Sequence, residues 1–330
     1  EIHERLVGSE MCIRDSYSVA FYNMENLFDT IHDEGKNDYE YLPNGTNQWN
    51  TMKYKAKLKN MSEILSMLST DKLPMGPAII GVSEIENYRV LEDILKQPAL
   101  ADRGYQYVHY EGADQRGVDC AFFYNPKLFE LTNSKLVPYV YINDTVHKTR
   151  GFLIASGNIA GEKMHFIVNH WPSRAAASPA RERAGEQVRA IKDSLLREDS
   201  AAKIVIMGDM NDDPMDKSMA VALGAKRKPA DVGPTDLYNP WWDTLKKGYG
   251  TLMYKGKWNL FDQIVFTGNL LGTDRSTLKF YKHEIFRRDF MFQKEGKYKG
   301  YPKRTQAGGV WLNGYSDHLP TIIYLIKEVK

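Results

Sequence analysis

IVIMGDMNDDP, residues 204–214, is the most informative stretch of this sequence. An apolar run of strand length ends on Gly208, and an acid, an amide and two further acids follow before Pro214. If the chain stays extended past Gly208, Asp209 and Asn211 point to the same side, because side chains alternate along a strand. A carboxylate beside an amide can hold a water molecule or the oxygens of a phosphoryl group. The alternative interpretation is an acidic turn that closes a strand, since Asn, Asp and Pro favour turns.

The composition is that of a soluble globular protein. The chain has 330 residues, enough for one large domain or two ordinary ones, with 42% apolar and 26% charged residues. No stretch approaches the roughly 18 consecutive apolar residues of a membrane span. The formal charge of +2 argues against a polycation that wraps DNA, but it leaves a nucleic-acid partner open.

The N-terminal segment, residues 1–16, differs from the rest of the chain. It has no apolar core and no small-residue cleavage site, so it is not a signal peptide, and it resembles a translated sequencing adapter. We expect a non-native leader over residues 1–16 and a single domain over residues 17–330. A true export signal could have been replaced there, which favours an extracytoplasmic protein, secreted or lipid-anchored; otherwise we expect a cytoplasmic one.

Strands and helices are expected to alternate through the chain. A helix is predicted from Thr51, its cap, because its apolar residues are spaced for one face: Tyr54, Leu58, Met61, Leu65 and Leu68. A second long amphipathic helix is expected after residue 174. Strands are predicted at residues 18–23, 77–82, 105–110, 119–124, 131–141, 152–158, 163–169, 261–266 and 321–326. A loop-rich segment with several lysines and arginines follows at residues 287–304.

Six of the expected strands are apolar runs that carry a polar side chain at the carboxyl end. These side chains are Asn23, Glu84, His170, Asp209, Asp262 and Asp317. Charged groups gathered at strand ends repel one another unless a cation or a substrate binds there. Mg²⁺, Mn²⁺ or Ca²⁺ is favoured over zinc, because four nearby residues offer only oxygen or amide ligands: Glu84, Asp209, Asn211 and Asp317.

Six short motifs, in this order, resemble the endonuclease/exonuclease/phosphatase superfamily, in particular its Bacteroidetes-type members. They are FYNMENLF (21–28), VSEIEN (82–87), NHWPSR (169–174), MGDMND (207–212), FDQI (261–264) and SDHLP (316–320). The resemblance implies an α/β (α+β) fold of the DNase I-like kind. In that fold, a four-layer sandwich, two mixed and largely antiparallel β-sheets pack face to face and helices flank them.

The resemblance also implies a metal site and a nucleophile site. Glu84 would be the main Mg²⁺ ligand, with Asn23 beside it and Asp317 close by; Mn²⁺ or Ca²⁺ could substitute. Asp209 would orient or deprotonate the attacking water, and Asn211 would hold a phosphate oxygen.

Two histidines would face the scissile phosphate. His318 would be oriented by Asp262, because a carboxylate fixes the tautomer of an imidazole and raises its basicity. His170 would be the second, and its orienting carboxylate could be Glu111. Arg116 and Arg174 are expected to bind phosphate or to support the site.

The expected activity is metal-dependent phosphodiester hydrolysis by in-line attack of an activated water. We expect a monomeric nuclease, an endonuclease or exonuclease that acts on DNA or RNA. The alternatives are a phosphatase, a lipid phosphodiesterase of the inositol-phosphate or sphingomyelinase kind, and a binding protein that has lost catalysis on the same scaffold.

Overall fold

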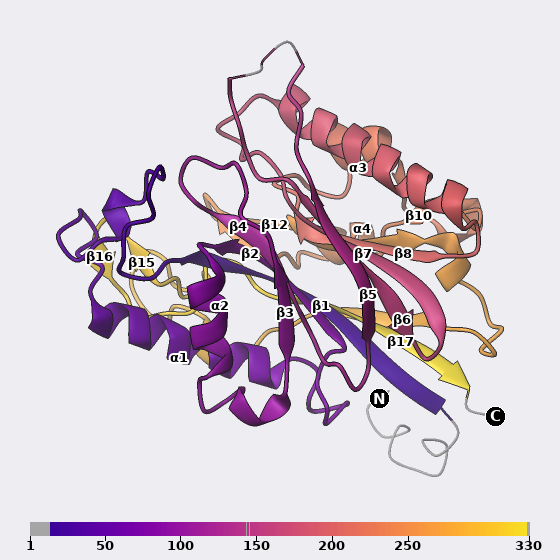
Figure 1. Ribbon diagram of the computed structural model, residues 1–330, viewed down its shortest axis with the longest axis horizontal. Coiled ribbons are helices and arrows are strands. Elements are labelled where there is room, and N and C mark those ends of the chain that lie inside the picture. Colours follow the sequence, from indigo (N-terminus) through magenta and orange to yellow (C-terminus); the bar gives the residue numbers. More distant parts are fainter. Residues whose placement is uncertain (1–13, 143, 145, 329–330) are drawn as a thin grey trace.

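A computed structural model describes residues 14–142, 144 and 146–328 (Figure 1). Two large β-sheets pack face to face, and helices cover their outer faces, as Figure 1 shows for α3 over one sheet. This arrangement confirms the predicted sandwich. No helix in the described part of the chain is long and apolar enough to cross a membrane.

The first sheet combines strands from both ends of the chain, in the order β14-β17-β1-β2-β4-β3. Its only parallel pair is β1 with β2; the other neighbours are antiparallel. The strands are β1 (Arg14–Leu27), β2 (Ile79–Ile85), β3 (Gln106–His109), β4 (Asp119–Tyr124), β14 (Lys279–Ile285) and β17 (Thr321–Glu328).

The second sheet has the order β5-β6-β7-β8-β13-β10-β9. Here β7 runs parallel to β8 and β9 to β10, and the remaining pairs are antiparallel. The strands are β5 (Glu130–Val137), β6 (Phe152–Ile159), β7 (Glu162–His170), β8 (Lys203–Asp209), β9 (Ala225–Lys226), β10 (Leu237–Tyr238) and β13 (Asp262–Thr267).

Four α-helices and two small hairpins complete the fold. The helices are α1 (Thr51–Met67), α2 (Tyr88–Leu95), α3 (Ser178–Glu198) and α4 (Trp242–Lys246). The hairpins are β11 (Leu252–Tyr254) with β12 (Lys257–Asn259), and β15 (Gln306–Ala307) with β16 (Val310–Trp311). Short helical turns are η2 (Tyr39–Tyr41), η3 (Ala101–Arg103), η4 (Ser218–Leu223), η5 (Pro229–Asp231), η6 (Gly268–Leu270) and η7 (Asp289–Met291).

Side-chain alternation along the strands builds three apolar layers. In β8, Val205 and Met207 face the other sheet, whereas Ile204 and Ile206 pack against α3. The outer face of the first sheet is covered by α1 and α2. The two sheets approach so closely that a Cβ added to Gly81 would lie 2.6 Å from the sulfur of Met207.

Several expected boundaries differ from the structure; the strand expected at residues 131–141, for example, is β5 and ends at Val137. Asn50, not Thr51, caps α1, because its side chain accepts a hydrogen bond from the backbone N–H of Lys53. Strand β1 begins at Arg14, so residues 14–16 pair with β17. These three residues belong to the segment expected to be a leader. The rest of that segment, residues 1–13, lies outside the described residues.

Candidate active site

Three acid/base side chains stand in one row on the second sheet. His170 ends β7 and is the register partner of Asp209, which ends β8. Asp209 is in turn opposite Asp262, the first residue of β13. Because directly paired residues in a sheet project from the same face, these three side chains meet at one edge.

The first sheet contributes Asn23 and Glu84 through irregular backbone. The ladder shifts register after Asn23 in β1 and around Glu84 in β2, and Glu84 has φ +58°. Glu25 and Asn26 also have positive φ, at 46° and 52°. Such conformations are unfavourable for side chains with a Cβ and persist where surrounding contacts hold them, often at functional sites. Here the N–H of Asn26 donates to Glu84 Oε2 at 3.0 Å.

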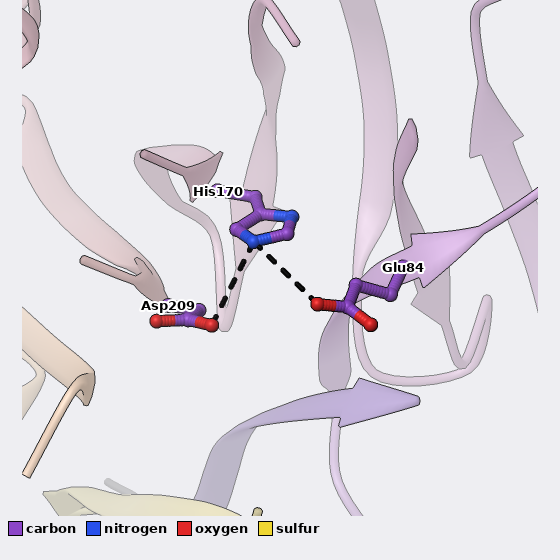
Figure 2. Close-up of side chains that lie close together, drawn as sticks. All are labelled: Glu84, His170 and Asp209. Carbon is purple, nitrogen blue, oxygen red and sulfur yellow. Dashed lines mark ion pairs between the residues drawn. The ribbon is translucent and has the colours of Figure 1, made fainter. Parts of the chain in front are cut away.

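The two sheets meet at Glu84, His170 and Asp209. Asn23 Nδ2 donates to Glu84 Oε1 at 3.2 Å and to Asp209 Oδ2 at 3.0 Å. His170 Nε2 lies 3.7 Å from each of these two carboxylate oxygens, as Figure 2 shows. Four side chains from four strands therefore surround one small volume.

His318 approaches the same volume from the loop before β17. Its Nδ1 lies 2.7 Å from Asp262 Oδ2, and its Nε2 lies 3.8 Å from Asp209 Oδ2. The imidazole is buried, which by itself would lower its pKa; the carboxylates of Asp262 and Asp209 outweigh burial and raise the pKa of His318 well above its ordinary value. The two carboxylates therefore favour the charged form of His318, and Asp262 fixes the orientation of its ring.

Asp209 and His170, two members of the row, have pKa values shifted in opposite directions. Burial raises the pKa of Asp209 to about 7, although His318 opposes that shift. Burial, followed by the charges of Arg150 and Arg116, lowers the pKa of His170 well below its ordinary value. His170 is therefore a neutral imidazole beside two carboxylates.

The donor set of this site fits a divalent cation. Ligand atoms of Glu84, His170 and Asp209 all lie within 4.8 Å of one another. The sequence predicts three metal ligands, and one of them, Glu84, belongs to this cluster. The other two are otherwise engaged: Asn23 Oδ1 accepts the N–H of Glu25 at 2.8 Å, and Asp317 Oδ2 lies 3.0 Å from Arg304 Nη2.

Asn211 reaches the site through a turn and not through strand alternation. Strand β8 ends at Asp209 and Asn211 has φ +52°, so of the two interpretations of this stretch the structure has the turn after the strand. The N–H of Asn211 donates to Asp209 Oδ1 at 2.9 Å, and its Nδ2 donates to the carbonyl of Trp171 at 3.0 Å. The turn orients the Asp209 carboxylate.

Glu111 does not orient His170, which corrects that expectation. Nδ1 of His170 is buried and has no hydrogen-bond partner among the described residues. Glu111 is exposed and lies with His109 and Asp119, whose side chains are 3.1 Å apart. The cause is topological: Glu111 follows the edge strand β3 of the first sheet, whereas His170 belongs to the second sheet.

Arg174 and Arg116 differ in their availability. The guanidinium of Arg174 stacks on Phe261 and contacts the carboxylates of Asp212, Asp213 and Asp216, all within 3.4 Å. Arg174 thus stabilises the loop after β8, and the expectation that it binds phosphate is not supported. The Arg116 side chain is 48% exposed, with only a 3.8 Å approach to Asp114, so it remains available to an anion.

Sequence reasoning missed the cations that support the site. Arg150 is buried and donates to Asp114 and to the carbonyl of Trp171, each at 3.0 Å. Arg304 donates to Glu25 at 2.8 Å. Lys57 is fully buried and donates to Thr305 and to the carbonyl of Tyr315. A signal for Lys57 was present, since a lysine on the buried side of an amphipathic helix is unusual.

Comparison with known proteins finds a matching family and several similar solved structures. Residues 18–327 match the family described as Endonuclease/Exonuclease/phosphatase family. No curated protein matches this sequence. One similar solved structure is an endonuclease/exonuclease/phosphatase family protein from Bacteroides thetaiotaomicron, with 15% identity, 96% of each chain covered and a TM-score of 0.59.

Two further solved structures have the same fold. A mannosyl-6-phosphatase from Bacteroides thetaiotaomicron shares 14% identity over 94% of this chain and 99% of its own, with a TM-score of 0.57. TDP2 from D. rerio, complexed with a single-strand DNA product, shares 14% identity over 94% of this chain and 98% of its own, with a TM-score of 0.53.

Proposed function

Because the chain belongs to the endonuclease/exonuclease/phosphatase family, we propose that it is a divalent-metal-dependent hydrolase of phosphodiester bonds and that its substrate is a nucleic acid. The observation that carries the proposal is the approach of His318 to Asp209. The Nε2 atom of a charged imidazole and a carboxylate oxygen lie 3.8 Å apart and face the same volume as Glu84.

His318 stabilises negative charge on the phosphoryl group. Asp262 binds its Nδ1, so its Nε2–H is directed at the site. A fixed imidazolium stabilises the transition state more than the ground state, because negative charge builds up on the equatorial oxygens during attack. The same Nε2–H can donate its proton to the leaving oxygen as the P–O bond to that oxygen breaks.

Asp209 orients the attacking water and accepts its proton. With burial raising its pKa to about 7, the carboxylate is a stronger base than an exposed aspartate. Asn211 N–H holds Oδ1, which leaves Oδ2 on the side of the two histidines. Proton transfer of this kind contributes about 10² to 10⁴-fold to the rate.

Glu84, with Asp209 and His170 beside it, would hold the metal. When bound, a divalent ion supplies electrophilic stabilisation of the phosphoryl oxygens. The carboxylate oxygens favour Mg²⁺, and Mn²⁺ or Ca²⁺ are substitutes. Asn23 keeps the Glu84 and Asp209 carboxylates together through its two hydrogen bonds.

A second candidate function is phosphomonoester hydrolysis. The mannosyl-6-phosphatase has this fold over 94% of the chain, and the row of His170, Asp209 and Asp262 suits a monoester as well as a diester. We favour a nucleic acid because the single-strand DNA product complex of D. rerio TDP2 has the same fold.

The test is hydrolysis of bis-p-nitrophenyl phosphate, p-nitrophenyl phosphate and plasmid DNA in Mg²⁺, Mn²⁺ or EDTA. Metal-dependent cleavage of the diester and of DNA supports the nuclease. Cleavage of the monoester alone replaces it with the phosphatase. Equal rates in EDTA and in Mg²⁺ contradict both.

A further inference from the structure

An open basic pocket lies at the end of β14, in the segment of residues 287–304. Its volume is about 390 Å³, and four of its lining side chains are cationic. They are Arg287, Arg288, Lys294 and Lys299. The segment holds seven lysines and arginines against two acids, whereas the whole chain holds 44 against 42. Positive charge is therefore concentrated here.

This pocket adjoins the edge that carries the active site. Strand β14 pairs with β17 so that Ile285 is opposite Thr321, and the N–H of Phe286 donates to the carbonyl of Pro320 at 2.8 Å. His318 comes two residues before Pro320 and is bridged to Leu252 of the β11–β12 hairpin. The pocket thus begins one strand away from the candidate catalytic histidine.

Arg287 is held in this position by aromatic rings and has no anionic partner in the described part of the chain. Its guanidinium carbon lies 5.6 Å from the ring centre of Tyr249 and 4.9 Å from those of Trp258 and Phe292. Its Nη1 is buried and has no hydrogen-bond partner among the described residues. Aromatic faces stabilise a cation without neutralising it, so Arg287 lines the pocket with a positive charge that no carboxylate of the described residues compensates.

Resting on the proposed function, we propose that this pocket binds a second phosphate group of the substrate, separate from the phosphate that is cleaved. Arginine and lysine are the side chains that bind phosphate oxygens most strongly. Lys294 and Lys299 are exposed and line the pocket, so their ammonium groups can contact a phosphate there, while the aromatic rings hold Arg287 in place. The ligand is a molecule with at least two phosphates.

The test is binding measured by calorimetry in EDTA, which separates it from hydrolysis. The two probes are a thymidine tetranucleotide with a 5′-phosphate and fructose 1,6-bisphosphate. Each is compared with a counterpart that has a single phosphate, namely thymidine 5′-monophosphate and fructose 6-phosphate. The variant Lys294→Gln/Lys299→Gln removes two exposed cations with little risk to folding. The matched control is Lys127→Gln/Lys228→Gln, because both lysines are exposed and neither lines the pocket. Lys127 follows the C-terminal end of β4.

Wild type is expected to prefer the multiply phosphorylated probe. The pocket variant should bind that probe about tenfold more weakly, because charge-assisted contacts are lost. The dependence of log Kd on log salt should fall by about 1 for each lost contact. The control variant should bind as wild type does.

The two probes identify the source of the second phosphate. A pocket-dependent preference for the oligonucleotide assigns a nucleic-acid backbone, and one for the sugar bisphosphate assigns a small phosphorylated metabolite. Equal binding of both probes by wild type and pocket variant overturns the proposal, even if the enzyme cleaves diesters. Pocket-dependent binding without metal-dependent cleavage would instead overturn the proposed hydrolysis and leave the pocket in place.

Discussion

His318 and Asp262 join the two sheets at the candidate active site. Asp262 opens β13 of the second sheet, His318 precedes β17 of the first, and Nδ1 lies 2.7 Å from Oδ2 across the sheet interface. Both side chains are buried. The orientation of the imidazole therefore depends on how the sheets pack, and that packing is set by the large apolar core between them.

Replacing Asp262 by Asn should uncouple His318 from this support. The pKa of His318 is raised above its ordinary value mainly by Asp262, so the variant should lose the imidazolium at a lower pH than wild type. We expect kcat/KM for bis-p-nitrophenyl phosphate to fall by about 10² to 10³ and the alkaline limb of the pH–rate profile to move to lower pH. An unchanged alkaline limb would contradict the role of the pair.

Adding Mg²⁺ or Mn²⁺ should stabilise the fold through Glu84. A ligand that binds only the folded state at 100 times its Kd adds about 2.7 kcal/mol, which raises Tm by about 3 to 6 °C in a chain of this size. Differential scanning fluorimetry should show this rise in wild type and in the exposed control Glu198→Gln. The Glu84→Gln variant should not respond to metal; an equal rise there would place the metal elsewhere.

Lys57→Met should destabilise the protein far more than Lys59→Met. Lys57 is fully buried and makes hydrogen bonds to Thr305 and Tyr315, and its charge is near the buried carboxylate of Glu25. Removing one partner of a buried charge network costs about 3 kcal/mol. Lys59 lies on the same helix with a side chain 72% exposed, where a change is within about 0.5 kcal/mol. Urea unfolding of both variants measures the difference, and similar midpoints would refute it.

His283 should make the fold sensitive to acid. Burial lowers its pKa from 6.5 to about 4, and its Nε2 lies 2.9 Å from Thr244 Oγ1. Between pH 6.5 and 4 the unfolded chain takes up a proton that the folded chain does not, so stability falls as the pH falls through this window. The loss should reach about 2 to 3 kcal/mol. In His283→Gln this part of the acid dependence should disappear; parallel stability curves for variant and wild type would contradict the assignment.

Much of the fold was predictable because strand ends were marked in the sequence. An apolar run followed by a polar residue predicted where Asp209 and His170 would stand, and period-two alternation predicted which side chains enter the core. Asp262 differs, because it begins β13 and does not end a strand. The family resemblance supplied what the pattern could not, namely the order of strands in two facing sheets.

The residues that hold the catalytic side chains in place could not be predicted, because their roles depend on contacts between segments that are distant in the sequence. Glu111 was expected at His170, yet it follows an edge strand of the other sheet. Arg174 was expected to bind phosphate because it is positively charged. Three aspartates of the loop after β8 contact its guanidinium instead. Arg304 reaches Glu25 across 279 residues of sequence, and no local pattern indicates such a pair.

The most direct measurement is kcat/KM for bis-p-nitrophenyl phosphate in Mg²⁺ for wild type, His318→Ala and Glu111→Gln, with circular dichroism to verify folding. We expect metal-dependent hydrolysis by wild type, a loss of about 10³-fold in His318→Ala, within the range of general acid/base and electrostatic groups, and wild-type rates in Glu111→Gln. A folded His318→Ala variant with the wild-type rate would contradict the proposed active site.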